Sequence, residues 1–241
     1  MKERIQKIMA EQGHCSRRAA EQLIREGRVK LNGRPASLGD KMDILKDHIS
    51  VDGVTLVLQK RRQMLYYLLH KPRGYVTTLS DRHAAKTIVD LMPGIAGRVY
   101  PVGRLDKDSE GLLLLTNDGE LANRLTAPGS KIAKLYRVTV RPAPTEEQLI
   151  ALSQGVTLDD GYRTGTTVIR VAEENPGRGV LEFTLHEGKN RQIRRMCDAV
   201  GLEVVRLKRT AIGPLRLGML QPGQMRELKK EELAAIRNAV K

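Results

Sequence analysis

Short apolar segments alternate with polar turns along the whole chain, and the most apolar of them lies near its middle. Residues 112–115 are four consecutive leucines, bounded by Gly111 on one side and by a polar turn at 117–119 on the other. Such a run is typical of a strand that is buried on both faces. Asp118 can cap a helix over residues 120–125. The polar loop before Gly111 therefore leads directly into a buried strand, which gives a side chain on that loop a rigid support.

The pattern from residue 64 onward mixes the two-residue period of strands with the longer period of helices. Residues 134–140 alternate and are rich in strand-forming side chains, whereas Thr145 can cap a helix with two glutamates in its first turn. Many strands with helices between them predict an α+β fold with a mostly antiparallel sheet and flanking helices. Further strands are expected at residues 65–69, 75–78, 166–171, 180–185, 204–209 and 225–228, and further helices at 87–92, at 191–200 after a cap at Asn190, and at 229–240.

Residues 1–60 are predicted to form a small α/β unit of their own. Apolar residues recur at helical spacing near the N-terminus, Ser16 can cap a second helix, and Gly27 can end it. Asn-Gly and Asp-Gly pairs between short β-rich stretches then indicate two hairpins. Residues 61–63 are expected to be a short basic linker, and residues 64–241 to form the second, larger domain.

The composition points to a nucleic acid as partner. The chain has 241 residues, 40% of them apolar, and a formal net charge of +14. A domain this basic usually binds polyanions. A membrane surface is the less favoured polyanion, because the sequence contains no basic amphipathic helix with large aromatic residues. No apolar run reaches the roughly 18 residues that would span a bilayer, and the N-terminus lacks a signal-peptide core. Cys15 and Cys197 have no Cys-x-x-Cys spacing, which favours a reducing compartment. We expect a cytoplasmic monomer.

Basic residues gather in the predicted N-terminal unit. An isolated run of this kind is often only a solvated helix face, but the total charge of the chain favours contact with the phosphates of a nucleic acid. Aromatic residues are scarce, with one Phe, six Tyr and no Trp, so a broad platform for stacking bases is not expected. The candidate nucleic-acid contacts, which become RNA contacts if the resemblance described below holds, are Arg17, Arg18, Arg28, Lys30 and Arg34.

A charged loop, residues 103–111, lies between two glycines and carries Asp106 and Asp108. Its spacing is similar to the start of a calcium-binding loop, but the twelfth position, which should hold a bidentate Glu, is Asn117. The five histidines show no spacing typical of metal ligands. A P-loop and a dinucleotide-binding fingerprint are also missing from the sequence. We therefore expect neither a metal nor a cofactor, and any catalysis must use the protein's own side chains.

The same loop resembles a known motif. Gly-Arg-Leu-Asp at residues 103–106, followed by Ser-x-Gly-Leu-Leu-Leu-Leu-Thr-Asn-Asp-Gly at 109–119, is similar to the active-site motif of the small-subunit-type (RsuA-like) ribosomal RNA pseudouridine synthases. Among them the chain looks closest to the large-subunit, B-type members. Residues 16–33 resemble the S4 RNA-binding domain. The resemblance implies an isomerase that modifies ribosomal RNA, with 23S RNA favoured and 16S RNA second.

The resemblance also implies roles for single residues. Asp106 would be the catalytic carboxylate, and Arg194, within the motif at 187–196, would pair with it. Tyr136 would stack on the target uracil. Arg104 would fill the space that the flipped base leaves.

Pseudouridine formation agrees with a site that has no cofactor. The uracil leaves C1′, rotates and bonds again through C5, so the net reaction is an isomerisation. The nucleotide must leave the stack before its C1′ can be reached, which implies base flipping. The carboxylate could attack C1′, attack C6 or remove a proton at C2′, and the sequence leaves these three routes open.

Two other functions are compatible with parts of the sequence. A non-catalytic S4-type RNA-binding protein or ribosome-assembly factor would need only the N-terminal unit. The intact loop around Asp106, together with Tyr136 and Arg194, argues against that alternative. A DNA-binding regulator with a helix-turn-helix at residues 5–27 is the weaker alternative, and competition between ribosomal RNA and duplex DNA would distinguish it.

Overall fold

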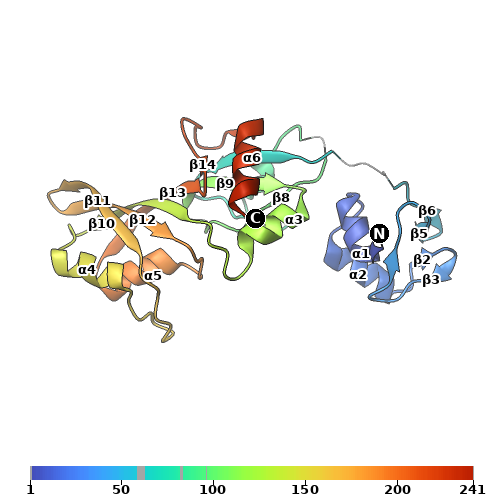
Figure 1. Ribbon diagram of the computed structural model, residues 1–241, viewed down its shortest axis with the longest axis horizontal. Helices are drawn as coiled ribbons and strands as arrows, with labels where there is room; N and C mark the ends of the chain where they lie inside the picture. Colours follow the sequence, from blue (N-terminus) through green and yellow to red (C-terminus); the bar gives the residue numbers. More distant parts are fainter. Residues whose placement is uncertain (1, 59–62, 82–83, 96, 241) are drawn as a thin grey trace. The chain divides into compact units, whose positions relative to one another are not determined.

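The chain divides into two compact units in a computed structural model, shown in Figure 1. The structure describes residues 2–58, 63–81, 84–95 and 97–240. The first unit is made chiefly of residues up to Met64 and the second of residues from Leu65 onward. Most of the predicted linker, residues 61 and 62, lies outside the described residues, so the domain limits 1–60, 61–63 and 64–241 stay a prediction.

The N-terminal unit has two helices packed on small antiparallel sheets. Ser16 caps the second helix, and its Oγ accepts a hydrogen bond from the amide of Ala19 at 3.0 Å. The strand order of the larger sheet is β3-β2-β5-β6, and β1 pairs with β4. Ile5, Val29 and Met42 are fully buried where the helices meet the strands. The elements are α1 (Ile5–Glu11), α2 (Arg17–Arg25), β1 (Glu3–Arg4), β2 (Val29–Leu31), β3 (Arg34–Pro35), β4 (Lys41–Met42), β5 (Ile49–Val51) and β6 (Val54–Thr55).

The second unit is built on one mixed sheet of nine strands in its described part. The strand order is β11-β12-β10-β13-β9-β7-β15, with β14 paired to β13 and β8 paired to β9. All pairs are antiparallel except β9 with β13, so the predicted α+β fold with a mostly antiparallel sheet is confirmed. The strands are β7 (Tyr66–Lys71), β8 (Tyr100–Pro101), β9 (Glu110–Thr116), β10 (Lys134–Arg141), β11 (Val168–Asn175), β12 (Arg178–Leu185), β13 (Glu203–Ile212), β14 (Leu215–Arg216) and β15 (Met225–Glu227).

Strand β9 is the predicted leucine strand, and both of its faces are covered. Leu112 and Leu114 pack against helices α3 and α6, whereas Leu113 and Leu115 pack against Ile88 and its neighbours on the opposite face. All four leucines are fully buried, and each contributes about 1.5–3 kcal/mol relative to an exposed side chain. The flanking elements are α3 (Gly119–Thr126), α6 (Lys230–Ala239) and the 3-10 helix η1 (Ile88–Leu91).

The other half of the sheet has its own apolar core. Helices α4 (Glu146–Gln154) and α5 (Gln192–Ala199) lie on one face of strands β10 and β12 in Figure 1. Leu152 from α4 and Met196 from α5 are fully buried there beside Phe183 of β12. Thus β13 and β9, the parallel pair, join two separately packed halves of one sheet.

Two of the secondary-structure predictions differ from the structure. Residues 75–78 form only a single bridge, between Val76 and Thr87, instead of a strand. The N-terminal cap of α5 is Arg191 with a left-handed backbone, φ +48°, and not Asn190. None of the helices formed by the described residues is long and apolar enough to cross a membrane.

Candidate active site

The loop with Asp106 is fixed at its C-terminal end by a close approach of two backbones. Gly111 of β9 lies opposite Arg209 of β13 in the parallel pair. A Cβ atom at Gly111 would lie 2.2 Å from the backbone oxygen of Arg209, and the glycine has φ +113°. Only glycine satisfies both conditions without displacing a strand. The loop therefore enters β9 at a position that the rest of the sheet determines.

The carbonyl groups of six consecutive loop residues, 104–109, all accept hydrogen bonds. Their donors come from the end of β7 and the segment after it, from α5, and from β13. Buried carbonyls without donors would cost free energy, so these contacts hold the loop in one conformation. The donors are Arg209 Nη1 for Arg104 at 3.5 Å, Thr77 Oγ1 for Leu105 at 2.6 Å, Lys71 Nζ for Asp106 at 2.9 Å, the Gly74 amide for Lys107 at 2.7 Å, Arg194 Nη2 for Asp108 at 3.1 Å and Lys71 Nζ for Ser109 at 2.8 Å.

Lys71 is a fully buried cation below this loop. Besides the two loop carbonyls, its ammonium donates to the carbonyl of Pro72 at 3.1 Å, so all three of its protons have acceptors. Burial lowers the pKa of Lys71 to about 8, although the nearby carboxylates of Asp106 and Asp108 act in the opposite direction. The lysine therefore connects the end of β7 to the loop that carries Asp106.

A cleft of about 1020 Å³ opens beside the loop, between β10, the end of β12 and the start of α5. It brings together all four side chains that the sequence indicated, because Arg104, Asp106, Tyr136 and Arg194 line it. Asp106 and Tyr136 are half-buried, and Arg104 is exposed. A second hollow of about 490 Å³, lined by Asp106, Arg73 and Lys107 among others, adjoins the same carboxylate.

Arg194 does not form the ion pair that the sequence resemblance implied. Its Nε lies 3.3 Å from the carboxylate of Asp108, whereas no ion pair joins it to Asp106 in the described part of the chain. Two backbone carbonyls orient the guanidinium, that of Val204 at 2.9 Å and that of Asp108 at 3.1 Å. Only 11% of the Arg194 side chain is exposed. The expected pairing with Asp106 is therefore corrected to a pairing with Asp108.

Asp108 is held by a second arginine. Arg191 Nη1 donates to both carboxylate oxygens of Asp108, at 3.2 and 3.1 Å. Burial acts to raise the pKa of Asp108, but the hydrogen bond from Arg191 and the charge of Arg194 outweigh burial and lower this pKa. Because Arg191 is the residue with the left-handed backbone at the start of α5, this contact fixes the helix to the loop.

Comparison with known proteins shows the family to which the chain belongs. Residues 65–199 match the family described as RNA pseudouridylate synthase, and residues 3–49 match the S4 domain. An RNA pseudouridine synthase of Aquifex aeolicus (strain VF5) is 45% identical over 100% of this chain and 96% of its own length. The ribosomal large subunit pseudouridine synthase B of Bacillus subtilis (strain 168) is 41% identical over 98% of this chain and 96% of its own. The chain belongs to the RNA pseudouridylate synthase family.

A solved structure described as a pseudouridylate synthase supports the same assignment. It is 30% identical, has a TM-score of 0.69, and the match covers 97% of this chain and 99% of that one. The chain is thus an RNA pseudouridine synthase with an N-terminal S4 domain, and RNA is its substrate. The expected RsuA-like family, enzyme class and fold are confirmed.

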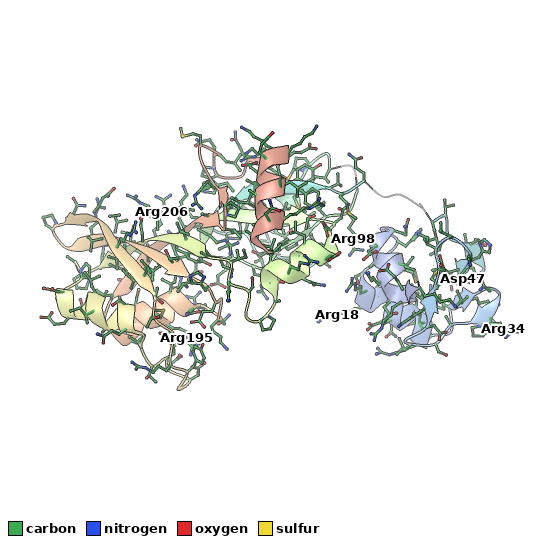
Figure 2. All side chains as sticks on the ribbon, viewed as in Figure 1. Arg18, Arg34, Asp47, Arg98, Arg195 and Arg206 are labelled. Carbon is green, nitrogen blue, oxygen red and sulfur yellow. The ribbon has the colours of Figure 1, made fainter. Side chains whose placement is uncertain are left out.

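The basic residues of the S4 domain differ in their partners. The guanidinium of Arg28 donates to both carboxylate oxygens of Asp52, at 2.8 and 2.6 Å, and to Glu26 at 3.1 Å. Its charge is therefore neutralised within the domain. By contrast, Arg18, Lys30 and Arg34 have no ion-pair partner among the described residues, and Arg17 lies 3.8 Å from Glu11. Figure 2 shows Arg18 and Arg34 at the surface of the domain, on α2 and on the β2–β3 hairpin.

Sequence reasoning missed the residues that hold the synthase loop in place. Lys71 and Thr77 lie about 30 residues before the loop and bind its backbone oxygens. Because every residue has such an oxygen, no sequence motif indicates these contacts. Arg209 offered a weak signal. Arg209 follows Leu207 by two residues, so both side chains point to the same, apolar face of the strand. A cation on such a face is unusual.

Proposed function

We propose that this synthase converts uridine to pseudouridine in ribosomal RNA, with 23S RNA as the favoured substrate and 16S RNA second. The support is the name of the Bacillus subtilis relative, a ribosomal large subunit synthase, whose match covers nearly the whole of both chains. The net charge of +14 and the S4 domain agree with a large, structured RNA as partner.

Asp106 is the proposed catalytic carboxylate. Two carboxylates line the large cleft, those of Asp106 and Glu187. Glu187 already accepts hydrogen bonds from Tyr162 at 2.8 Å and from Gln192 at 2.5 Å. The carboxylate of Asp106 has no hydrogen-bond partner among the described residues, although its backbone is held on every side. A fixed carboxylate with free oxygens is the observation that carries the proposal.

The other cleft residues suit a flipped nucleotide. Tyr136 presents a half-buried ring in the wall of the cleft, where it stacks on the target uracil. Arg104 is exposed at the edge of the loop and takes the place of the base in the RNA stack. Three routes then remain for Asp106: attack on C1′, attack on C6, or removal of a proton at C2′. All three require its ionised form.

The first prediction tests the role of Asp106. Asp106→Asn should abolish pseudouridine formation in unmodified 23S ribosomal RNA while the RNA binds within a few-fold of the parent, because the amide keeps the shape but cannot be ionised. Asp198→Asn, an exposed position on α5, is the matched control. Turnover by the Asp106→Asn protein would disprove the assignment.

The choice of RNA needs a separate experiment. Pseudouridines are mapped in both ribosomal RNAs of a strain that lacks this protein, with and without a plasmid that restores it. One uridine of 23S RNA should lose its modification and regain it with the plasmid. Complete modification of both ribosomal RNAs in the deletion strain would contradict the proposed substrate.

A further inference from the structure

Lys134 lies at the start of β10, in the wall of the cleft. It precedes Tyr136 by two residues, so the two side chains emerge on the same face of the strand. In the sheet register Lys134 is opposite Leu185 of β12 and Ile212 of β13, both of them buried and both in the cleft wall. An amphipathic side chain in this setting rests its aliphatic part on apolar neighbours and carries its charge at the cleft.

The ammonium group of Lys134 has no hydrogen bond or ion pair with any described residue. Burial lowers the pKa of Lys134, and the positive charge of Arg209 lowers it further. Charges that are partly withdrawn from water in proteins are normally paired with an opposite charge. Here the charged neighbour is a second cation, Arg209, so the charged form of Lys134 is destabilised in the protein without RNA.

Arg209 adds to the unbalanced charge of this wall. It lies opposite Tyr136 in the register and is only 3% exposed. Its Nε donates to the carbonyl of Leu112 at 2.8 Å, and its Nη1 to that of Arg104 at 3.5 Å. Its Nη2 has no partner, and no carboxylate forms an ion pair with Arg209 among the residues that the structure describes. Lys134 and Arg209 thus both lie at the cleft, and neither forms an ion pair with a carboxylate of the described residues.

We propose that Lys134, supported by the buried charge of Arg209, binds a backbone phosphate of the RNA next to the target uridine. Uracil and ribose are neutral, so phosphate is the anion that the substrate brings into the cleft. The proposal deepens the proposed function and rests on the cleft beside Asp106 as the place where the target nucleotide binds. Lys134 thereby fixes the flipped nucleotide from the phosphate side while Tyr136 contacts its base.

The test compares Lys134→Met and Lys134→Arg with the control Lys230→Met, an exposed lysine at the start of α6. Binding of unmodified 23S ribosomal RNA is measured over a range of salt concentrations, each variant also carrying Asp106→Asn so that turnover plays no part. Lys134→Met should weaken binding and reduce the slope of log K against log salt by about 0.7–0.9, the value for one phosphate contact. Lys134→Arg should restore the slope, and Lys230→Met should leave it unchanged.

Thermal melting separates binding from a structural role. Since Lys134 is an unpaired charge in the free protein, Lys134→Met should melt at or above the temperature of the parent. An unchanged salt slope for Lys134→Met, or a lower melting temperature, would overturn the proposal. The proposed function fails separately, if the parent enzyme forms no pseudouridine in the same RNA.

Discussion

Asp106 and Asp108 are separated by one residue, yet their surroundings differ completely. Asp108 accepts from Arg191 and forms an ion pair with Arg194, whereas Asp106 has free oxygens in the cleft. Both arginines thus bind Asp108 and not Asp106, the carboxylate that we propose to be catalytic. Their contacts with Asp108 hold the start of α5 against the loop, and this in turn fixes the backbone that carries Asp106.

A double-mutant cycle tests this division between the two carboxylates. Arg194→Ala and Asp108→Asn should each lower the free energy of unfolding, and their combined effect should differ from the sum by about 0.5–3 kcal/mol, the range for residues in contact. Arg194→Ala combined with Asp106→Asn should be close to additive. Denaturant unfolding of the five variants measures both cycles. Strong coupling of Arg194 to Asp106 in the free protein would restore the pairing expected from the sequence.

His70 provides a prediction about pH. Its Nδ1 lies 2.6 Å from the carbonyl of Leu220, and its Nε2 is buried without a partner among the described residues. Burial lowers the pKa of His70 below its ordinary value of 6.5. Below about pH 6.5 the unfolded chain binds a proton at this position that the folded protein binds only at lower pH, so stability falls as the pH falls.

The measurement compares the melting temperature of the parent with that of His70→Asn between pH 7 and about pH 5, the range set by the ordinary histidine pKa. The parent should lose more stability over this range, because the amide of Asn can still donate to Leu220 but does not titrate. His186→Asn is the control, since the exposed His186 also lies beside a carbonyl, that of Lys131 at 2.9 Å. Equal losses for the parent and His70→Asn would contradict the prediction.

At the scale of elements, the loop depends on connections from strands far away in the sequence. Lys71 ends β7 and donates to loop carbonyls 35 and 38 residues later. Strand β13 contributes Arg209 and runs parallel to β9 at Gly111. Residues 104–109 of the loop are therefore held to the sheet by side chains and by the Gly74 amide, although they lie outside the strands.

Lys71→Met should show how much these connections contribute. The methionine fills a similar volume but removes the donor of the Pro72 and Ser109 carbonyls, at about 1–3 kcal/mol for each one that is buried, whereas the Asp106 carbonyl keeps the amide of Ser109 at 3.0 Å. We expect a clear loss of unfolding free energy and a slower single-turnover rate, because the position of Asp106 is less well defined. Lys107→Met, an exposed lysine of the same loop, should keep the parent's stability. A Lys71→Met protein as stable as the parent would show that the three hydrogen bonds are dispensable.

Local patterns predicted local structure well. The four leucines of β9 and the caps at Ser16, Asp118 and Thr145 depend on neighbours within a few residues, and the structure has them as expected. The same patterns could not show which carboxylate meets Arg194. Asp106 and Asp108 are separated from Arg194 by nearly the same number of residues. The orientation of α5 decides between them, and it depends on the left-handed backbone of Arg191, which the sequence pattern did not indicate.

At the scale of the whole molecule, charge on the S4 domain should decide how strongly RNA binds. Arg34 has no ion-pair partner among the described residues, whereas Arg28 is neutralised by Asp52 and Glu26. Arg34→Ala should therefore weaken RNA binding and reduce the salt slope by about 0.7–0.9, the value for one phosphate contact. Arg28→Ala should change the slope far less. Filter binding to ribosomal RNA over a salt series measures both, and equal effects would contradict this distinction.

The six accepting carbonyls of the loop have a consequence for how such an enzyme diverges. Because the donors contact main-chain oxygens, the position of Asp106 is insensitive to which side chains stand at its exposed neighbours, such as Lys107. Substitutions at such exposed positions leave the main-chain hydrogen bonds intact, so the proposed catalytic carboxylate keeps its place beside the sheet. The side chains at the rim of this loop are therefore free to vary without moving the Asp106 backbone.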